Sequence, residues 1–250
     1  MADRFLLMWL EGPMQSWGSD SRYGRRETQF FPTKSGISGL LLSALGAGGS
    51  QTELLKVLSA ARMDVIAYQY TRDKQVLAEK PELLRDYQVT GNGYDSKDAW
   101  QKLQVPKTVD GQAVVGGGTK ITSRYYLQDA VFAVILQLPE NQADVFSAAL
   151  QDPVWTVFLG RKNCIPTEWI YQGCFSSTDE AREKAAELVK QKRDDESGLK
   201  LAVFAEIADG FDGEGQELTV SDVPLEFGLF KQYGRRSIAY IDCREGTDAE

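Results

Sequence analysis

The chain has 250 residues, a formal net charge of −8, 42% hydrophobic and 26% charged residues, which is the composition of an ordinary globular protein. No apolar run approaches the roughly 20 residues of a membrane-spanning helix, so we expect no membrane partner. The sequence contains no histidine, and its three cysteines form no Cys-x-x-Cys pair, so we expect no metal and no cofactor.

The acidic charge is concentrated in one segment. Residues 201–230 contain seven Asp and Glu residues and no Lys or Arg, so this segment supplies most of the net charge. We expect a solvated acidic loop there. The basic clusters elsewhere are short and favour a small groove over a broad nucleic-acid surface. The N-terminus lacks the apolar core and cleavage site of a signal peptide, so we expect a cytoplasmic protein.

The hydrophobic pattern predicts an α+β fold in two parts. In 1–175 we expect a strand over 4–11, helices over 33–46 and 52–61, strands over 63–70 and 121–138, a helix over 143–151 and a strand over 167–175. This β-α-β-β-α-β order is typical of a modified ferredoxin-like fold. Residues 75–122 interrupt it as a polar, glycine-punctuated excursion, which we interpret as a hairpin.

Residues 176–250 are predicted to form a smaller C-terminal α+β subdomain. Ser177 and Glu180 are typical of the start of a helix, which we expect to run to about residue 193. Strands are expected over 199–207 and 235–243, with the acidic loop between them.

The start of the helix over 33–46 carries a weak phosphate-binding signal. A helix N-terminus presents free N–H groups to an anion, and Lys34 opposes the helix dipole unless an anion is bound there. Gly36 would leave room for a phosphate. A nucleotide P-loop is excluded because no Gly-x-x-x-x-Gly precedes Lys34-Ser35. The alternative is a capped helix with an exposed lysine.

Two further segments could hold a nucleic acid. The loop at 160–163, Gly-Arg-Lys-Asn, combines backbone N–H groups with two cations, and its alternative is a plain surface turn. Arg22, Arg25 and Arg26 alternate with Tyr23, a composition that grips and stacks on single-stranded nucleic acid. The alternative for these residues is a solvated basic loop.

The remaining aromatic residues allow several roles. We expect Trp9, Trp155 and Trp169 in the core, whereas Trp17 fits either the core or a binding surface. Tyr125 and Tyr126, with Arg124 and Lys120 nearby in the sequence, could in principle support RNA cleavage, although their spacing does not indicate it.

Five segments, in this order, carry a family resemblance: LEGPMQSWG, FPTKSGISGLL, LRDY, SRYYLQDAVF and FLGRKNCIP. Together they closely resemble the CasD family of type I-E CRISPR Cascade, which is part of the RAMP superfamily. The resemblance extends from Leu7 to about Gly173. It implies an RRM-like RAMP fold with a protruding thumb, for which 75–122 is the candidate.

The resemblance also implies a function and a set of partners. A member of this family would be a non-catalytic subunit that binds the 5′ handle of the CRISPR RNA and caps the Cascade backbone. Its protein partners would be the backbone subunit and the large subunit, and it would meet target DNA only indirectly. The residues expected to contact RNA are Gln15, Trp17, Arg22, Arg25, Arg26, Lys34, Ser35, Gly36, Arg124, Gly160, Arg161, Lys162 and Asn163.

Two other functions stay open from the sequence. Type I-C relatives cleave repeat RNA without a metal, using Tyr, Lys and His, so an endonuclease of that kind is the first alternative, although this chain has no histidine. The second alternative is a ferredoxin-like protein that scaffolds an assembly or binds a small ligand without RNA.

Overall fold

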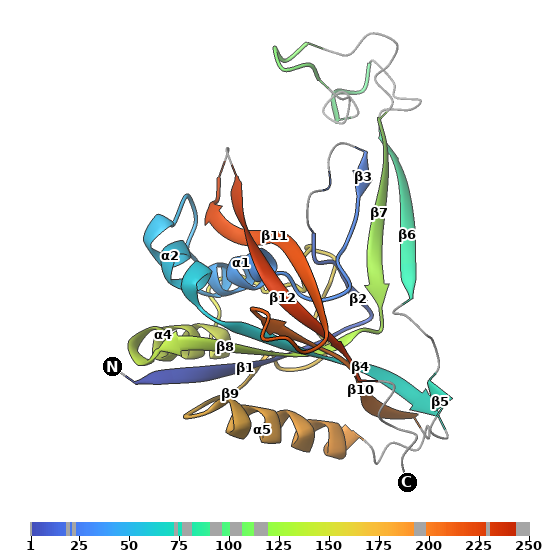
Figure 1. The fold of residues 1–250 in the computed structure, drawn as a ribbon. Helices are drawn as coiled ribbons and strands as arrows, with labels where there is room; N and C mark the ends of the chain where they lie inside the picture. The colour runs from blue at the N-terminus through green and yellow to red at the C-terminus, as the bar shows by residue number, and fades with distance from the viewer. Residues whose placement is uncertain are drawn as a thin grey trace.

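The computed structural model describes residues 2–18, 21, 24–72, 75–76, 82–90, 97–100, 107–112, 120–192, 199–228 and 231–243. The fold is α+β, as expected, with one large antiparallel sheet, helices on both of its faces and a smaller sheet beside it (Figure 1). No helix within these ranges is long and apolar enough to cross a membrane.

The large sheet contains strands from almost the whole chain. Its order is β11 (Gln216–Glu226), β12 (Gln232–Asp242), β10 (Leu199–Asp209), β4 (Met63–Arg72), β8 (Val131–Pro139), β1 (Asp3–Glu11) and β9 (Tyr171–Phe175), and β5 (Gln75–Val76) pairs with β4. All of these pairs are antiparallel.

Helices cover both faces of this sheet, which explains the continuous apolar run of β1. On one face Leu6, Met8 and Leu10 pack against α1 (Lys34–Ala44), α2 (Thr52–Ala60) and α4 (Glu140–Gln151). On the other face Leu7 and Trp9 pack against α5 (Thr178–Gln191). Neighbouring side chains of a strand point to opposite faces, so a single strand serves two cores.

The best-predicted element is α1. Thr33 is its N-cap and accepts a hydrogen bond from the Gly36 amide at 3.2 Å, as the sequence indicates. The helix is followed by Gly46 at φ 67°, a conformation that glycine adopts at little cost. The predicted cap of α5 is also present, because Ser177 accepts from the Glu180 amide.

Two predictions about strands are wrong. The single strand expected over 121–138 is two, β7 (Lys120–Gln128) and β8, because the chain turns at Asp129, which has φ 47°, and passes from the small sheet to the large one. The acidic segment is not a solvated loop, since it forms the end of β10 and the whole of β11. Alternate residues of β11, Leu218 and Val220 among them, pack against the main core.

The two paired strands of the hairpin expected over 75–122 are present. β6 (Leu83–Thr90) pairs with β7 over eight positions, and Figure 1 shows the two strands extending from the body as an arm. Most of the connection between them lies outside the described residues. The small sheet is completed by β2 (Met14–Gln15) and β3 (Arg25–Arg26), which also pair with β7.

The predicted boundary near residue 175 is not a break in the sheet. β10 pairs with β4 along most of its length, so the C-terminal strands extend the same sheet that the first part of the chain builds. The division into 1–175 and 176–250 stays a prediction.

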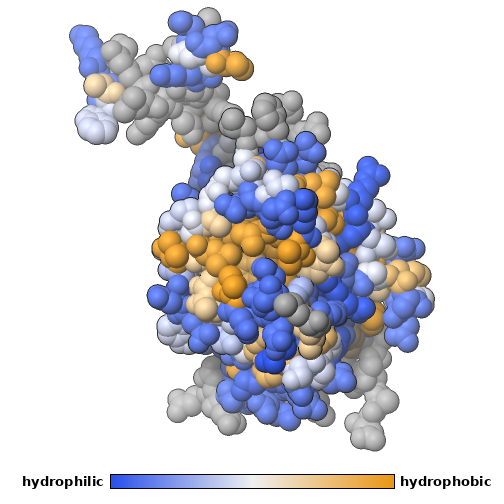
Figure 2. Space-filling view, turned by 90° about the vertical axis from the view of Figure 1, so that its left-hand side faces the viewer, coloured by the Kyte–Doolittle hydropathy of each residue, from blue (hydrophilic) through white to orange (hydrophobic). Residues whose placement is uncertain are grey.

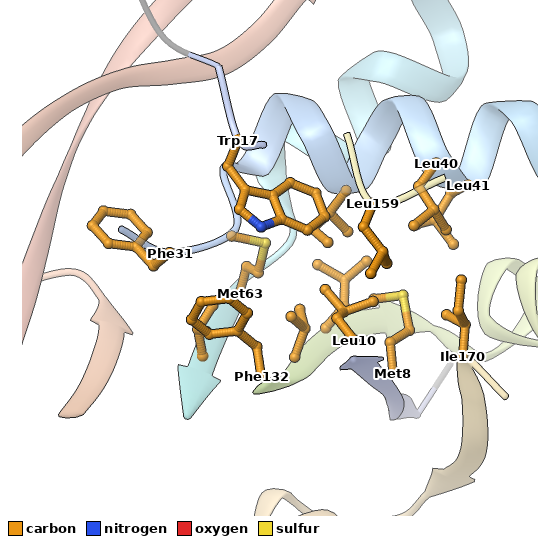
Figure 3. Packing of buried hydrophobic residues seen from close by; sticks show 14 of the residues in the cluster. Met8, Leu10, Trp17, Phe31, Leu40, Leu41, Met63, Phe132, Leu159 and Ile170 are labelled. Atoms are coloured by element: carbon orange, nitrogen blue, oxygen red, sulfur yellow. The ribbon is translucent and has the colours of Figure 1, made fainter. Parts of the chain in front are cut away.

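A buried tryptophan anchors the main core. Figure 3 shows the indole of Trp17 beneath α1, with Phe31 on one side and Leu159 on the other. Trp9 is buried as expected, but the core positions expected for Trp155 and Trp169 are wrong, since these residues are 50% and 79% exposed. Trp155 and Trp169 lie outside the helices and strands, one after α4 and the other before β9. The hydrophobic pattern of such segments does not predict whether a side chain points into the core.

One face of the molecule exposes apolar side chains. Figure 2 shows them gathered on the side that carries α2 and α4 in Figure 1. Exposed apolar residues in and directly after α4 are Val145, Val154 and Trp155. Exposed apolar patches of this kind often take part in protein contacts.

Candidate functional site

An open groove of about 560 Å³ lies where three of the sequence motifs meet. The turn after β1, the start of α1 and the loop around Gly160 each contribute to it, and the ends of β11 and β12 complete it. Its described lining contains two cations and no acidic side chain, in a chain of net charge −8. The lining residues are Ser16, Gly18, Thr33, Ser35, Gly36, Gly39, Leu40, Ser43, Phe158, Gly160, Arg161, Phe227, Lys231 and Tyr233.

Gln15 and Trp17 build the turn under the groove from inside the protein. The buried Gln15 amide donates to the carbonyls of Leu10 at 3.1 Å and Ala130 at 2.6 Å, and its oxygen accepts from the Trp17 indole at 3.1 Å. Both side chains are fully buried. The structure therefore gives no support to the predicted RNA contacts of Gln15 and Trp17, and their observed role is to shape the chain that does line the groove.

Gly160 brings its loop against that turn. It has φ 94°, and a Cβ at this position would collide with the Ser16 carbonyl oxygen. The Ser16 amide donates to the Leu159 carbonyl at 3.1 Å. Only glycine combines this backbone conformation with so close an approach, so Gly160 holds two distant segments together at the groove.

Gly36 has a packing role in addition to its place in the groove. A Cβ there would lie 2.7 Å from the Trp17 ring, so the absence of a side chain at Gly36 allows α1 to pack directly against the indole. From the sequence alone, a glycine at this position is explained by the room that it would leave for a phosphate. The structure supplies a steric reason inside the core.

Lys34 does not point into the groove. Its side chain is buried, with 4% of the residue exposed, and Nζ donates to Asp209 Oδ2 and to the Ser59 carbonyl, each at 3.0 Å. The structure agrees with neither interpretation of Lys34 from the sequence: its ammonium does not face the groove to bind a phosphate, and its side chain is not exposed. The sequence predicts an anion beside Lys34, and in the structure the carboxylate of Asp209 is that anion.

The same carboxylate belongs to a buried charge network that joins α1 to the C-terminal strands. Asp222 on β11 accepts from the Lys34 amide at 2.8 Å, which satisfies the first N–H group of α1. Arg236 on β12 binds Asp222 through two nitrogens at 2.8 and 2.9 Å and lies 3.2 Å from Asp209. Such paired and hydrogen-bonded charges are costly to separate once buried.

Asp209 shows the electrostatic balance in this network. Burial of its carboxyl would raise its pKa, but the cations of Arg236 and Lys34 outweigh burial and lower the pKa below its ordinary value. A carboxylate with a lowered folded-state pKa contributes stability above its unfolded pKa, and this contribution is lost as the pH falls through the folded value.

Arg161 links the groove to the small sheet. Its guanidinium donates to the carbonyls of Tyr125 at 3.1 Å and Arg26 at 3.0 Å and lies 4.8 Å from the centroid of the Tyr126 ring. It is half-buried and still lines the groove. Arg161 therefore holds β3 and β7 in place and presents charge at the same time.

The other predicted cations lie around the groove, not in it. Arg25 and Arg26 are exposed on β3, where Arg25 pairs with Glu27 at 2.6 Å. Arg124 lies beside Arg26 in the register of β3 and β7. Lys162 and Asn163 are exposed next to Arg161, and Arg22 lies outside the described residues.

Among the groove residues that sequence reasoning missed are the three from the C-terminal part of the chain: Phe227, Lys231 and Tyr233. The signal was present, since two aromatic residues and a lysine are grouped at the end of the acidic segment, but that segment was interpreted as a loop. Partial burial raises the pKa of the Tyr233 hydroxyl. Within the described ranges, no group of three or more acidic or cysteine residues is arranged to hold a metal ion.

Comparisons with known proteins agree with one another. The family model described as CRISPR-associated protein (Cas_Cas5) matches residues 5–239. The chain is 30% identical over 181 residues to the CRISPR system Cascade subunit CasD of Escherichia coli (strain K12), an alignment that covers 70% of this chain and 73% of that protein.

Solved structures give the same result at the level of the fold. A chain in a CRISPR RNA-guided surveillance complex matches with a TM-score of 0.68 and 26% identity, covering 95% of this chain and 89% of that one. A crystal structure of a Cas protein matches with a TM-score of 0.54 and 22% identity over 96% of each chain, which is a likeness of fold alone.

Gly160→Ala should destabilise the protein. The added Cβ meets the Ser16 carbonyl and must adopt φ 94°, so we expect a loss of at least about 1–2 kcal/mol in the free energy of unfolding. Urea denaturation measures it. Gly18→Ala is the matched control, because a Cβ there has no neighbour within 4 Å, and equal losses in the two variants would contradict the role given to Gly160.

Lys34→Met should act as a folding variant. It leaves Asp209 with one cation fewer in a buried site, so we expect a loss of about 3–5 kcal/mol at neutral pH. The folded pKa of Asp209 would rise, so acid unfolding should begin at a higher pH than in the wild type. The exposed Lys56→Met is the control and should change stability by less than about 0.5 kcal/mol. A Lys34 variant as stable as this control would contradict the network's importance.

Proposed function

The chain belongs to the CRISPR-associated protein (Cas_Cas5) family, and from this premise we propose that it is a non-catalytic RNA-binding subunit of a Cascade surveillance complex. In this role it holds the 5′ handle of the CRISPR RNA in the groove between the Gly160 loop and α1. The partners would be the handle RNA, the backbone subunit and the large subunit, with target DNA engaged indirectly through the complex.

The observation that carries this proposal is the electrostatic character of the groove. Arg161 and Lys231 line it, Lys162 lies beside Arg161, and no acidic residue is among its described lining. The nearby carboxylates of Asp209 and Asp222 are paired with Lys34 and Arg236. A polyanion can therefore approach this groove although the chain as a whole is acidic.

The residues that line the groove suit an unpaired RNA strand better than a duplex. Serine and glycine residues make up half of its described lining, so a sugar-phosphate backbone can come close to the protein main chain. Phe158, Phe227 and Tyr233 supply aromatic surface. Small polar residues, cations and aromatic rings are the means by which proteins hold unpaired RNA.

The structure offers little to the endonuclease alternative. Tyr126 is 1% exposed, and Tyr125 has the Arg25 guanidinium 5.3 Å from its ring centroid. The chain has no histidine, so a general base would have to come from another residue type. We infer that RNA is bound and left intact.

The β6–β7 arm is the proposed contact with the backbone subunit. Its described residues expose apolar side chains on both faces: Leu83, Leu84, Tyr87, Val89 and Ile121. A two-stranded ribbon has no core of its own in which to bury them. Burial against a neighbouring protein chain would remove this apolar surface from water.

The first test measures RNA binding and cleavage together. The purified chain, and then the assembled complex, is incubated with its labelled cognate repeat RNA or with a scrambled RNA, and the products are examined on native and denaturing gels. We expect repeat-selective binding with intact RNA. In Lys162→Ala/Lys231→Ala the salt slope of the affinity should fall in magnitude by about 1.4, since each lost phosphate contact contributes about 0.7.

The control for this test removes the same charge elsewhere. Lys56 and Lys190 are exposed on α2 and α5, and Lys56→Ala/Lys190→Ala should keep the wild-type slope. An equal reduction in both double variants would mean that only net charge matters. Specific cleavage by the wild type would overturn the non-catalytic assignment.

A second test concerns assembly. Tyr87→Asp/Val89→Asp places charge on exposed positions of the arm, so the fold and RNA binding of the isolated chain should be unchanged. Co-purification with the backbone subunit should fall at least tenfold, because two charges would be buried in the interface. Ser50→Asp, exposed before α2, is the control. Normal assembly of the arm variant would exclude this contact.

A further inference from the structure

One glycine of the groove has no explanation inside the protein. Gly39 lies in the interior of α1, where alanine is the more favourable residue. Its φ is not positive, and a Cβ at this position would have no heavy atom within 4 Å. Gly36, by contrast, is required by the Trp17 ring. Gly39 lines the groove, so its missing side chain leaves open space there.

Gly36 and Gly39 make one face of α1 unusually flat. Both glycines are half-buried and line the groove, so the backbone of α1 is accessible there: the Trp17 ring fills the Cβ direction of Gly36 from inside, and the Cβ direction of Gly39 is open. Ser35 and Ser43 add only short hydroxyl groups to the same wall, and its other members, Thr33 and Leu40, are buried, with 1% and 4% of each residue exposed. A flat ligand can therefore lie directly against this wall.

The C-terminal strands provide an aromatic wall for the same groove. Tyr233 on β12 is 43% exposed, and Phe227 follows β11 and is half-buried. Their position relative to α1 is fixed by the buried network, because Asp222 on β11 binds both the first amide of α1 and Arg236 on β12. The strands that carry Phe227 and Tyr233 are thus held against α1 by the contacts of Asp222.

A flat ring beside a phosphate is the ligand that this arrangement fits. Tyr233 offers an exposed aromatic face, the glycine face of α1 leaves space for a second plane, and Lys231 supplies a cation. The groove volume of about 560 Å³ is in the range of sites that hold small ligands. Aromatic side chains bind unpaired bases by stacking, whatever the base.

We propose that one unpaired nucleobase of the bound RNA stacks on Tyr233 and lies against the glycine face formed by Gly36 and Gly39, with Lys231 at an adjacent phosphate. This inference rests on the proposed function, because it assumes RNA in the groove. It assigns a role in RNA recognition to the C-terminal strands, which carry none of the family motifs.

The experiment replaces the nucleotides of the 5′ handle one at a time by abasic residues within cognate repeat RNA. Wild-type chain, or the assembled complex, should lose affinity about 5- to 150-fold at one position, as expected for one stacked base. Tyr233→Ala should lose a similar factor on intact RNA and nothing more at that abasic position. Tyr233→Phe, which keeps the ring, should bind like the wild type.

Gly39→Leu tests the other wall. It fills the open space with a good helix former, so its thermal unfolding midpoint should not fall while RNA affinity drops at least tenfold. Trp169→Ala removes an aromatic residue that is more exposed than Tyr233 and does not line the groove, and it should leave binding unchanged. If Tyr233→Ala failed to fold, the abasic series on the wild type and the affinity of Gly39→Leu would still decide the question.

The outcomes separate the two proposals. Absence of RNA binding by the wild type, both alone and in the complex, would overturn the proposed function. Normal wild-type binding with no abasic position linked to Tyr233, or wild-type affinity in Gly39→Leu, would overturn the stacking site and leave the proposed function in place.

Discussion

The architecture of the groove depends on one buried charge network. Lys34, at the start of α1, is held by Asp209 of β10, while Asp222 of β11 binds the Lys34 amide and the guanidinium of Arg236 on β12. A helix N-terminus normally leaves free N–H groups and attracts an anion. Here the C-terminal strands supply that anion, which fixes the helix that forms one wall of the groove to the strands that form another.

The remaining wall is set by backbone geometry. Gly160 permits a contact with the Ser16 carbonyl that any Cβ would prevent, and Gln15 holds the turn that presents Ser16. Arg161 then binds carbonyls of Tyr125 and Arg26, so the loop also positions the small sheet. The groove is consequently built from main-chain contacts and buried hydrogen bonds, and the side chains that remain available to a ligand are few and mostly cationic, small or aromatic.

Local patterns in the sequence were sufficient for α1 and for the Ser177 cap of α5, because cap chemistry and hydrophobic period are properties of neighbouring residues. They also identified two loops that do meet at the groove. They could not show that Lys34 is buried, because its partner Asp209 lies 175 residues away. Nor could they place Tyr233, since its position at the groove follows from the pairing of β12 with the charge-rich β11, in which Tyr233 lies opposite Pro224.

The same network explains how an acidic chain can present a groove suited to the RNA ligand that we propose. Seven carboxylates lie between residues 201 and 230, and Phe227 in this segment, directly after β11, lines the groove. Asp209 and Asp222, the carboxylates that reach α1, are each bound to a buried cation, so their charge is balanced locally. Exposed acidic residues elsewhere would repel RNA from other surfaces. Charge distribution, more than total charge, would therefore restrict the proposed RNA strand to one groove.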